Sequence, residues 1–125
     1  TIAKANATSE KIGTVTLQSL DIENTFGFGF YPKPGMCVGM IHDDLQKTKN
    51  VDRLVSVGIM STALTMRATN GANFSVHDFI TLLNKKLPEA FVEGGGHKNA
   101  GSINFVPNKK DEVLKMLKDY IKSSQ

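Results

Sequence analysis

The sequence contains one cysteine, no tryptophan and no apolar run near the length of a membrane span. The lone cysteine, Cys37, cannot close an internal disulfide, which is typical of proteins from reducing compartments. Crossing a bilayer takes about 20 consecutive apolar residues, and the N-terminal segment TIAKANATSEK lacks the apolar stretch of a secretory signal. These absences exclude a disulfide-stapled scaffold, predict no membrane association and favour a cytoplasmic location.

Composition predicts one ordinary globular domain over residues 1–125. The chain is 40% hydrophobic and 22% charged, which excludes a disordered or fibrous protein. Its 125 residues are too few for two full domains. Fifteen basic and 12 acidic side chains leave a net charge of +3, a weak preference for anionic partners. Because the sequence begins at Thr1 without methionine, it is read either as a processed chain or as a fragment of a longer one.

Hydrophobic periodicity predicts the strands. Alternating apolar and polar side chains predict a half-buried strand over residues 13–20, another over 25–31, and an adjacent pair within 54–68. Shorter apolar runs predict strands over 36–41 and near 102–106.

Helical spacing appears in the second half of the chain. Ser75 precedes an apolar stripe that ends at Pro88, and Asn108 precedes a second apolar stripe. Ser75 and Asn108 are therefore the predicted N-caps of two helices. The polar residues 42–50 predict one or two helical turns. Together the elements predict an α/β fold, a single domain with a mixed sheet of about five strands flanked by helices.

A glycine-rich segment, residues 94–101 (GGGHKNAG), is the strongest candidate for a binding site. Three glycines lack Cβ atoms and can turn successive backbone N–H groups toward one anion, so they predict a loop that forms a phosphate-binding nest. His97 can donate a hydrogen bond, Lys98 adds positive charge, and Asn99 can both donate and accept. The alternative is a flexible surface turn in which His97 is incidental.

This segment resembles the GGGH-x-x-AAG signature of the DHH-associated domain, the C-terminal substrate-binding module of DHH-family phosphoesterases. That family includes RecJ-type single-strand exonucleases, nanoRNases that also dephosphorylate 3′-phosphoadenosine 5′-phosphate, and cyclic-dinucleotide phosphodiesterases. From Arg53 to the C-terminus the order of elements is also similar: a strand ending near Arg67, a helix, the GGGH segment, a strand and a final helix. The chain departs from the signature at Ala100-Gly101-Ser102, where the family has two alanines and a glycine.

The resemblance implies a set of substrate-binding residues. The glycines would hold backbone N–H groups against a substrate phosphate, and His97 would have the catalytic role of positioning the scissile phosphate. Arg67 would pair with a phosphate through its planar fork; the alternative is a surface arginine at a strand edge. The full implied set is Arg67, Gly94, Gly95, Gly96, His97, Lys98 and Asn99.

The resemblance also implies where catalysis occurs. The family builds its metal centre in a preceding domain around an Asp-His-His triplet, which this sequence does not contain. We therefore expect no metal or other cofactor site in this chain, a divalent metal, manganese, in a preceding DHH catalytic domain, and no activity of the chain alone. The chain would be the C-terminal substrate-binding part of an enzyme that hydrolyses phosphodiester or phosphomonoester bonds of nucleotides or short single-stranded oligonucleotides.

Two other functions fit the same residues. One is a stand-alone, non-catalytic module that binds nucleotides or single-stranded nucleic acid, as related RNA-contacting modules of alanyl-tRNA synthetases do. The other is a domain whose substrate is polyphosphate or another inorganic chain, which the same nest could accept. The sequence leaves open the choice among RNA, DNA and mononucleotides, and the oligomeric state.

Three further features carry less weight. His42-Asp43-Asp44 has metal-ligand residue types but too few further ligands, so a solvated loop is expected. The phenylalanines within residues 26–30 alternate strictly with glycine, which favours a core face over a platform for stacking bases. His77 is expected to be exposed in the first turn of its helix.

Overall fold

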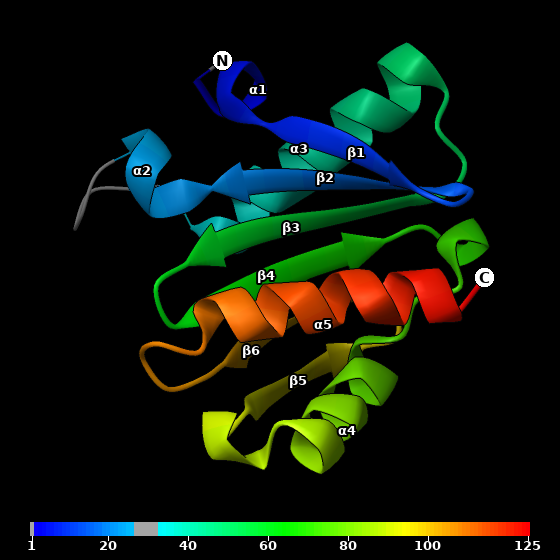
Figure 1. The fold of residues 1–125 in the computed structure, drawn as a ribbon. Coiled ribbons are helices and arrows are strands. Elements are labelled where there is room, and N and C mark those ends of the chain that lie inside the picture. The colour runs from blue at the N-terminus through cyan, green and yellow to red at the C-terminus, as the bar shows by residue number, and fades with distance from the viewer. Residues whose placement is uncertain (1, 27–32) are drawn as a thin grey trace.

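Six strands form one mixed sheet in the computed structural model, which describes residues 2–26 and 33–125 (Figure 1). The strands are β1 (Thr8–Ile12), β2 (Val15–Asp21), β3 (Leu54–Met60), β4 (Ala63–Ala68), β5 (Glu93–His97) and β6 (Ala100–Asn104), in the sheet order β1-β2-β3-β4-β6-β5. The β2–β3 pair is parallel, and every other neighbouring pair is antiparallel. The predicted α/β class is confirmed, with six strands instead of about five.

Helices cover both faces of this sheet (Figure 1). One face carries α1 (Ile2–Asn6), α2 (Ile22–Phe26) and α3 (Pro34–Lys49), the other carries α4 (Val76–Lys86) and α5 (Lys110–Ser123), and the connections hold the 3-10 helices η1 (Asn70–Ala72) and η2 (Pro88–Ala90). A large apolar cluster that includes Phe79 and Leu117 fills the space under α4 and α5. A smaller cluster with Leu20 and Ile41 lies on the α3 face. None of the helices in residues 2–26 and 33–125 is both long and apolar enough to traverse a bilayer.

The parallel β2–β3 pair requires a crossover connection, and α3 lies in that connection. Gly58 of β3 allows α3 to lie close to the sheet. A Cβ at this position would stand 2.7 Å from both the Val38 Cγ2 and the Ile22 Cδ1 atoms. The crossover therefore packs α3 tightly against β3 and covers the face of the sheet on which the candidate site lies.

Local sequence signals in the second half of the chain place its helices α4 and α5 and its strands β3, β4 and β6, but not the strand β5, which is predicted as a loop. The two strands predicted within residues 54–68 are β3 and β4. The Ser75 hydroxyl caps α4 by accepting the Asp78 N–H at 3.2 Å, as expected, and Pro88 begins η2 just beyond the helix. The last helix begins one residue later than expected, since Lys109 occupies the N-cap position and makes no side-chain cap hydrogen bond.

The other errors lie in the first half. Residues 36–41, predicted as a strand, and the polar stretch 42–50 together form most of α3, because a short apolar run has the same composition in a buried helix and a buried strand. Pro34, interpreted as part of a turn, stands in the first turn of that helix. The strand expected over residues 25–31 is wrong at its start, since Phe26 ends α2, and residues 27–32 lie outside the described part.

Candidate functional site

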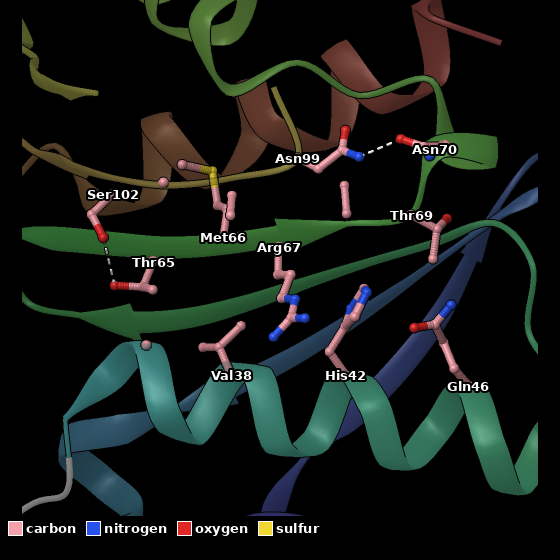
Figure 2. A pocket seen from close by; sticks show the side chains of 14 residues that line it. Val38, His42, Gln46, Thr65, Met66, Arg67, Thr69, Asn70, Asn99 and Ser102 are labelled. Carbon is pink, nitrogen blue, oxygen red and sulfur yellow. Dashed lines mark hydrogen bonds between the residues drawn. The ribbon is translucent and has the colours of Figure 1, made fainter. Parts of the chain in front are cut away.

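A pocket of about 720 Å³ opens between α3 and the strands β4 and β6; we call it the α3–β4 pocket (Figure 2). Three separate parts of the chain line it. They are Gly35, Val38, His42 and Gln46 of α3; Thr65, Met66, Arg67, Ala68, Thr69 and Asn70 of β4 and the turn that follows; and Asn99, Ala100, Gly101 and Ser102 at the start of β6. The predicted residues Arg67 and Asn99 are therefore brought together in one cavity.

Arg67 is the cation of this pocket. Its β4 position pairs with Ser56 of β3 and Ala100 of β6, so its side chain stands on the α3 face of the sheet. A guanidinium nitrogen lies 3.6 Å from the Asp43 carboxylate, and both side chains are about half exposed (46% and 53%). Such a solvated pair is weak, which leaves the fork free to bind another anion. Gly39 makes room for it, because a Cβ there would lie 2.8 Å from Arg67 Nη1.

Two hydroxyl groups stand on the same face. The Thr65 and Ser102 hydroxyl oxygens are 3.1 Å apart across the β4–β6 pair. Ser102 is where the chain departs from the glycine of the GGGH-x-x-AAG signature, and the structure accommodates it in extended β6. The substitution adds a hydrogen-bonding group to the wall of the pocket.

The glycine segment is a strand and not the predicted loop. Gly94, Gly95 and Gly96 lie in the edge strand β5, paired with β6. Successive N–H groups of an extended strand point to opposite sides, so the three do not converge in a nest. Their pairing with β6 places the segment one strand away from the pocket. An edge strand still leaves alternate N–H groups without a partner in the sheet, available to a ligand.

The other predicted residues surround this strand. His97 is exposed and pairs with Ala100, which places it on the Arg67 side of the sheet at the margin of the pocket. Lys98 is exposed in the turn after β5, and its carbonyl accepts the Val76 N–H at the start of α4. The Asn99 amide donates to the Asn70 side chain, while its own side-chain oxygen is buried and has no partner among the described residues. None of the three glycines, His97 or Lys98 lines the pocket itself.

Sequence reasoning missed His42, which lies at the centre of the pocket wall. The ring is only 2% exposed, and its Nδ1 is 2.8 Å from the Ser56 hydroxyl. The Ser56 hydroxyl in turn donates to the Gln18 side-chain oxygen at 3.0 Å. Burial lowers the pKa of His42, and the Arg67 guanidinium lowers it further against a smaller opposite effect of Asp43. The imidazole is therefore neutral at physiological pH.

The signal for this cluster was present in β2 and β3. Thr16 and Gln18 alternate with apolar residues in the strand predicted as half-buried over residues 13–20, and this pattern predicts a solvent-facing side. They are buried, at 8% and 7% exposure, because α3 covers that side. Polar residues on a covered face must find hydrogen-bond partners, and Gln18 finds Ser56.

The expected solvated loop at residues 42–44 is wrong. This triplet lies in α3, where Asp43 pairs with Arg67, and Asp44 lies 3.2 Å from the Lys4 ammonium group. Within residues 2–26 and 33–125, no three His, Cys, Asp or Glu side chains come together as a metal site. Cys37 is buried in the same helix, and burial raises the pKa of its thiol, so the sulfur is unreactive. His77 is exposed, as predicted.

Comparison with known proteins supports the resemblance. No protein-family model matches the sequence. The uncharacterized protein MJ1198 of Methanocaldococcus jannaschii is 29% identical over 114 residues, which are 87% of this chain and 15% of that protein. A solved structure described as a member of the s1p family of ribosomal proteins, PF0399 DHH domain, has a TM-score of 0.91 and 29% identity, covering 99% of this chain and 29% of that one. The chain thus spans less than a third of either relative.

Two more distant structures share the fold. The C-Ala domain of Aquifex aeolicus alanyl-tRNA synthetase has a TM-score of 0.58 and 18% identity, covering 92% of this chain and 98% of that domain. PggH of Vibrio cholerae, a pGpG-specific phosphodiesterase, has a TM-score of 0.58 and 11% identity, covering 98% of this chain and 37% of that one.

These likenesses define the class: the chain has the α/β fold of the DHH-associated domain, as the GGGH segment indicated. The PF0399 DHH domain protein is similar to this chain in both sequence and structure along nearly the whole chain.

Proposed function

We propose that this chain is the substrate-binding domain of a metal-dependent, cytoplasmic DHH-family phosphoesterase that acts on nucleotides or short oligonucleotides. The observation that carries the proposal is the placement of Arg67. Its fork stands in an open pocket beside two hydroxyl groups, with the GGGH strand at the margin, in a domain of the DHH-associated fold. Such a fork matches the geometry of a phosphate.

The proposed substrate is a nucleotide because PggH, which has the same fold, is specific for a dinucleotide. In this proposal Arg67 binds a substrate phosphate, and His97 contacts the phosphate that faces a preceding DHH catalytic domain. That domain would supply the divalent metal, manganese, which activates a water molecule. Lys98, Asn99 and those N–H groups of the Gly94, Gly95 and Gly96 segment that face away from β6 would add contacts at the margin.

Titration of the labelled 125-residue chain with adenosine monophosphate and a short oligonucleotide, followed by NMR, tests the binding. Arg67→Gln should weaken binding about 10- to 100-fold, the value of a charge-assisted hydrogen bond. Lys86→Gln is the matched control, since Lys86 is an exposed cation at the end of α4 on the other side of the sheet. Equal affinities of the two variants would contradict the assignment of Arg67.

Catalysis is tested separately. The chain with added manganese should release no phosphate and no nucleotide from these substrates. Turnover that His97→Ala abolishes would overturn the placement of the catalytic centre in another domain.

A second candidate is a non-catalytic module that binds RNA or nucleotides. The alanyl-tRNA synthetase C-Ala domain favours it, because the likeness covers 98% of that domain. If the gene that encodes this chain carries no Asp-His-His segment upstream, the module is the correct assignment, and the catalytic part of the proposal fails.

A further inference from the structure

A chain of hydrogen bonds runs from the core of the domain to the α3–β4 pocket. Gln18 of β2, Ser56 of β3 and His42 of α3 are linked in that order, at 3.0 and 2.8 Å, and all three are buried. The link crosses three elements that are distant in sequence. It holds the His42 ring in one orientation at the pocket wall (Figure 2).

The direction of these bonds fixes the tautomer of His42. The Ser56 hydroxyl donates its one hydrogen to the Gln18 side-chain oxygen, so toward His42 the same hydroxyl oxygen can only accept. His42 must therefore carry its hydrogen on Nδ1. In a neutral imidazole the other nitrogen, Nε2, is then a lone-pair acceptor.

Nε2 is available to a ligand. The described residues offer it no hydrogen-bond partner, yet Nε2 is not among their buried side-chain atoms that lack a partner, so this nitrogen keeps contact with solvent. Figure 2 shows the imidazole beside the Arg67 guanidinium in the pocket. The pocket thus holds the donors of the Arg67 guanidinium, which suit an anion, next to an acceptor of fixed orientation, His42 Nε2. A ligand that fills both has an anionic group with an O–H or N–H donor close to it.

We propose that His42 is a specificity residue of the α3–β4 pocket: its Nε2 accepts a hydrogen bond from a ligand O–H or N–H group while Arg67 holds the neighbouring phosphate. This rests on the proposed function. In a ribonucleotide the proposed donor is the ribose 2′-hydroxyl or the exocyclic amine of a base. A fully ionised polyphosphate chain has no such donor, so the pocket favours nucleotides over polyphosphate.

Binding measurements with the 125-residue chain separate the two donors. The ligands are the 5′-phosphorylated dinucleotides of riboadenosine, deoxyadenosine and ribouridine, with tripolyphosphate as the donor-free anion. If the ribose 2′-hydroxyl is the donor, the wild-type chain should bind the riboadenosine ligand about 3- to 10-fold more tightly than the deoxyadenosine one, the value of one neutral hydrogen bond. His42→Leu should abolish the difference. If the exocyclic amine is the donor, His42→Leu should instead abolish a preference for adenosine over uridine.

The control variants distinguish the failure of this inference from the failure of the proposed function. His77→Leu changes an exposed histidine of α4 and should keep the preference. Arg67→Gln should weaken all the dinucleotides alike. If dinucleotide binding depends on Arg67 but His42→Leu changes no preference among the ligands, the inference is overturned and the proposed function stands. Binding that is insensitive to Arg67 overturns both.

A second measurement uses only the wild-type chain, so it does not depend on whether a variant folds. The nitrogen NMR shifts of the wild-type His42 ring at neutral pH should identify Nε2 as the unprotonated nitrogen. An unprotonated Nδ1 would overturn the inference, because Nε2 would then be a donor.

Discussion

Substitution of each of the three consecutive glycines of β5 by alanine is expected to change the free energy of unfolding in opposite directions: a loss at Gly94 and Gly96, and no loss at Gly95. Gly94 and Gly96 have positive φ angles, 155° and 146°, which side chains rarely adopt. A Cβ at these positions would collide with the backbone carbonyl oxygens of the paired strand, those of Ser102 and Ala100 respectively. Gly95 has no positive φ, and a Cβ there would meet no atom within 4 Å.

The magnitudes follow from these geometries. Holding alanine in a strained positive-φ conformation costs about 1–3 kcal/mol, and the collision with strand backbone adds to it. Gly96→Ala should therefore lower the free energy of unfolding by at least about 2 kcal/mol. Gly95→Ala removes conformational freedom from the unfolded chain without strain in the folded one, which is worth about 0.4–1 kcal/mol of added stability.

Urea unfolding followed by circular dichroism measures both variants against the wild type. In thermal unfolding, 1 kcal/mol corresponds to about 3–6 °C in a domain of this size, so Tm should fall by at least about 6 °C for Gly96→Ala and stay level or rise for Gly95→Ala. An equal loss of stability in the two variants would refute the reasoning, since only the paired geometry of β5 distinguishes these glycines.

Two further predictions concern the pocket. The pKa of His42 is lowered in the folded chain, so the unfolded chain binds a proton at this histidine at higher pH than the folded chain does. The free energy of unfolding should therefore fall as the pH drops below the ordinary histidine value of 6.5. His42→Leu should reduce this pH dependence, and His77→Leu should not. Gly95→Val places a branched side chain on the pocket side of the sheet, opposite Ser102, and should weaken nucleotide binding. Its free energy of unfolding in urea should stay within about 1 kcal/mol of the wild-type value. Loss of the fold without a separate binding defect would make β5 purely structural.

The parts of the fold that could be predicted depend on signals contained in short segments. The Ser75 cap, Pro88 and an apolar stripe define α4 without any knowledge of the rest of the chain. By contrast β5 contains three glycines, which disfavour strands, and forms one only because β6 is available for pairing. Likewise α3 carries no continuous helical stripe, and its identity depends on its packing across β3.

The same difference applies to the candidate site. Arg67 and Asn99 could be singled out from the sequence because the resemblance covers their positions, and the structure brings both to one pocket; their binding roles stay predictions. His42 could not, since it becomes a pocket residue only when α3 covers a face of the sheet that looks solvent-exposed in sequence. Its partners Ser56 and Gln18 are 14 and 24 residues away along the chain.

The parallel β2–β3 pair also determines when a functional pocket can exist during folding. A hairpin such as β3–β4 closes locally, whereas a parallel pair forms only after its crossover has been laid down, and such long-range pairing is slow. Gln18 and Ser56 meet across that pair, 38 residues apart, and without their bond His42 has no fixed tautomer. A folding intermediate that holds only the C-terminal half would therefore contain Arg67 and the GGGH strand but would lack the fixed His42 acceptor in the pocket wall.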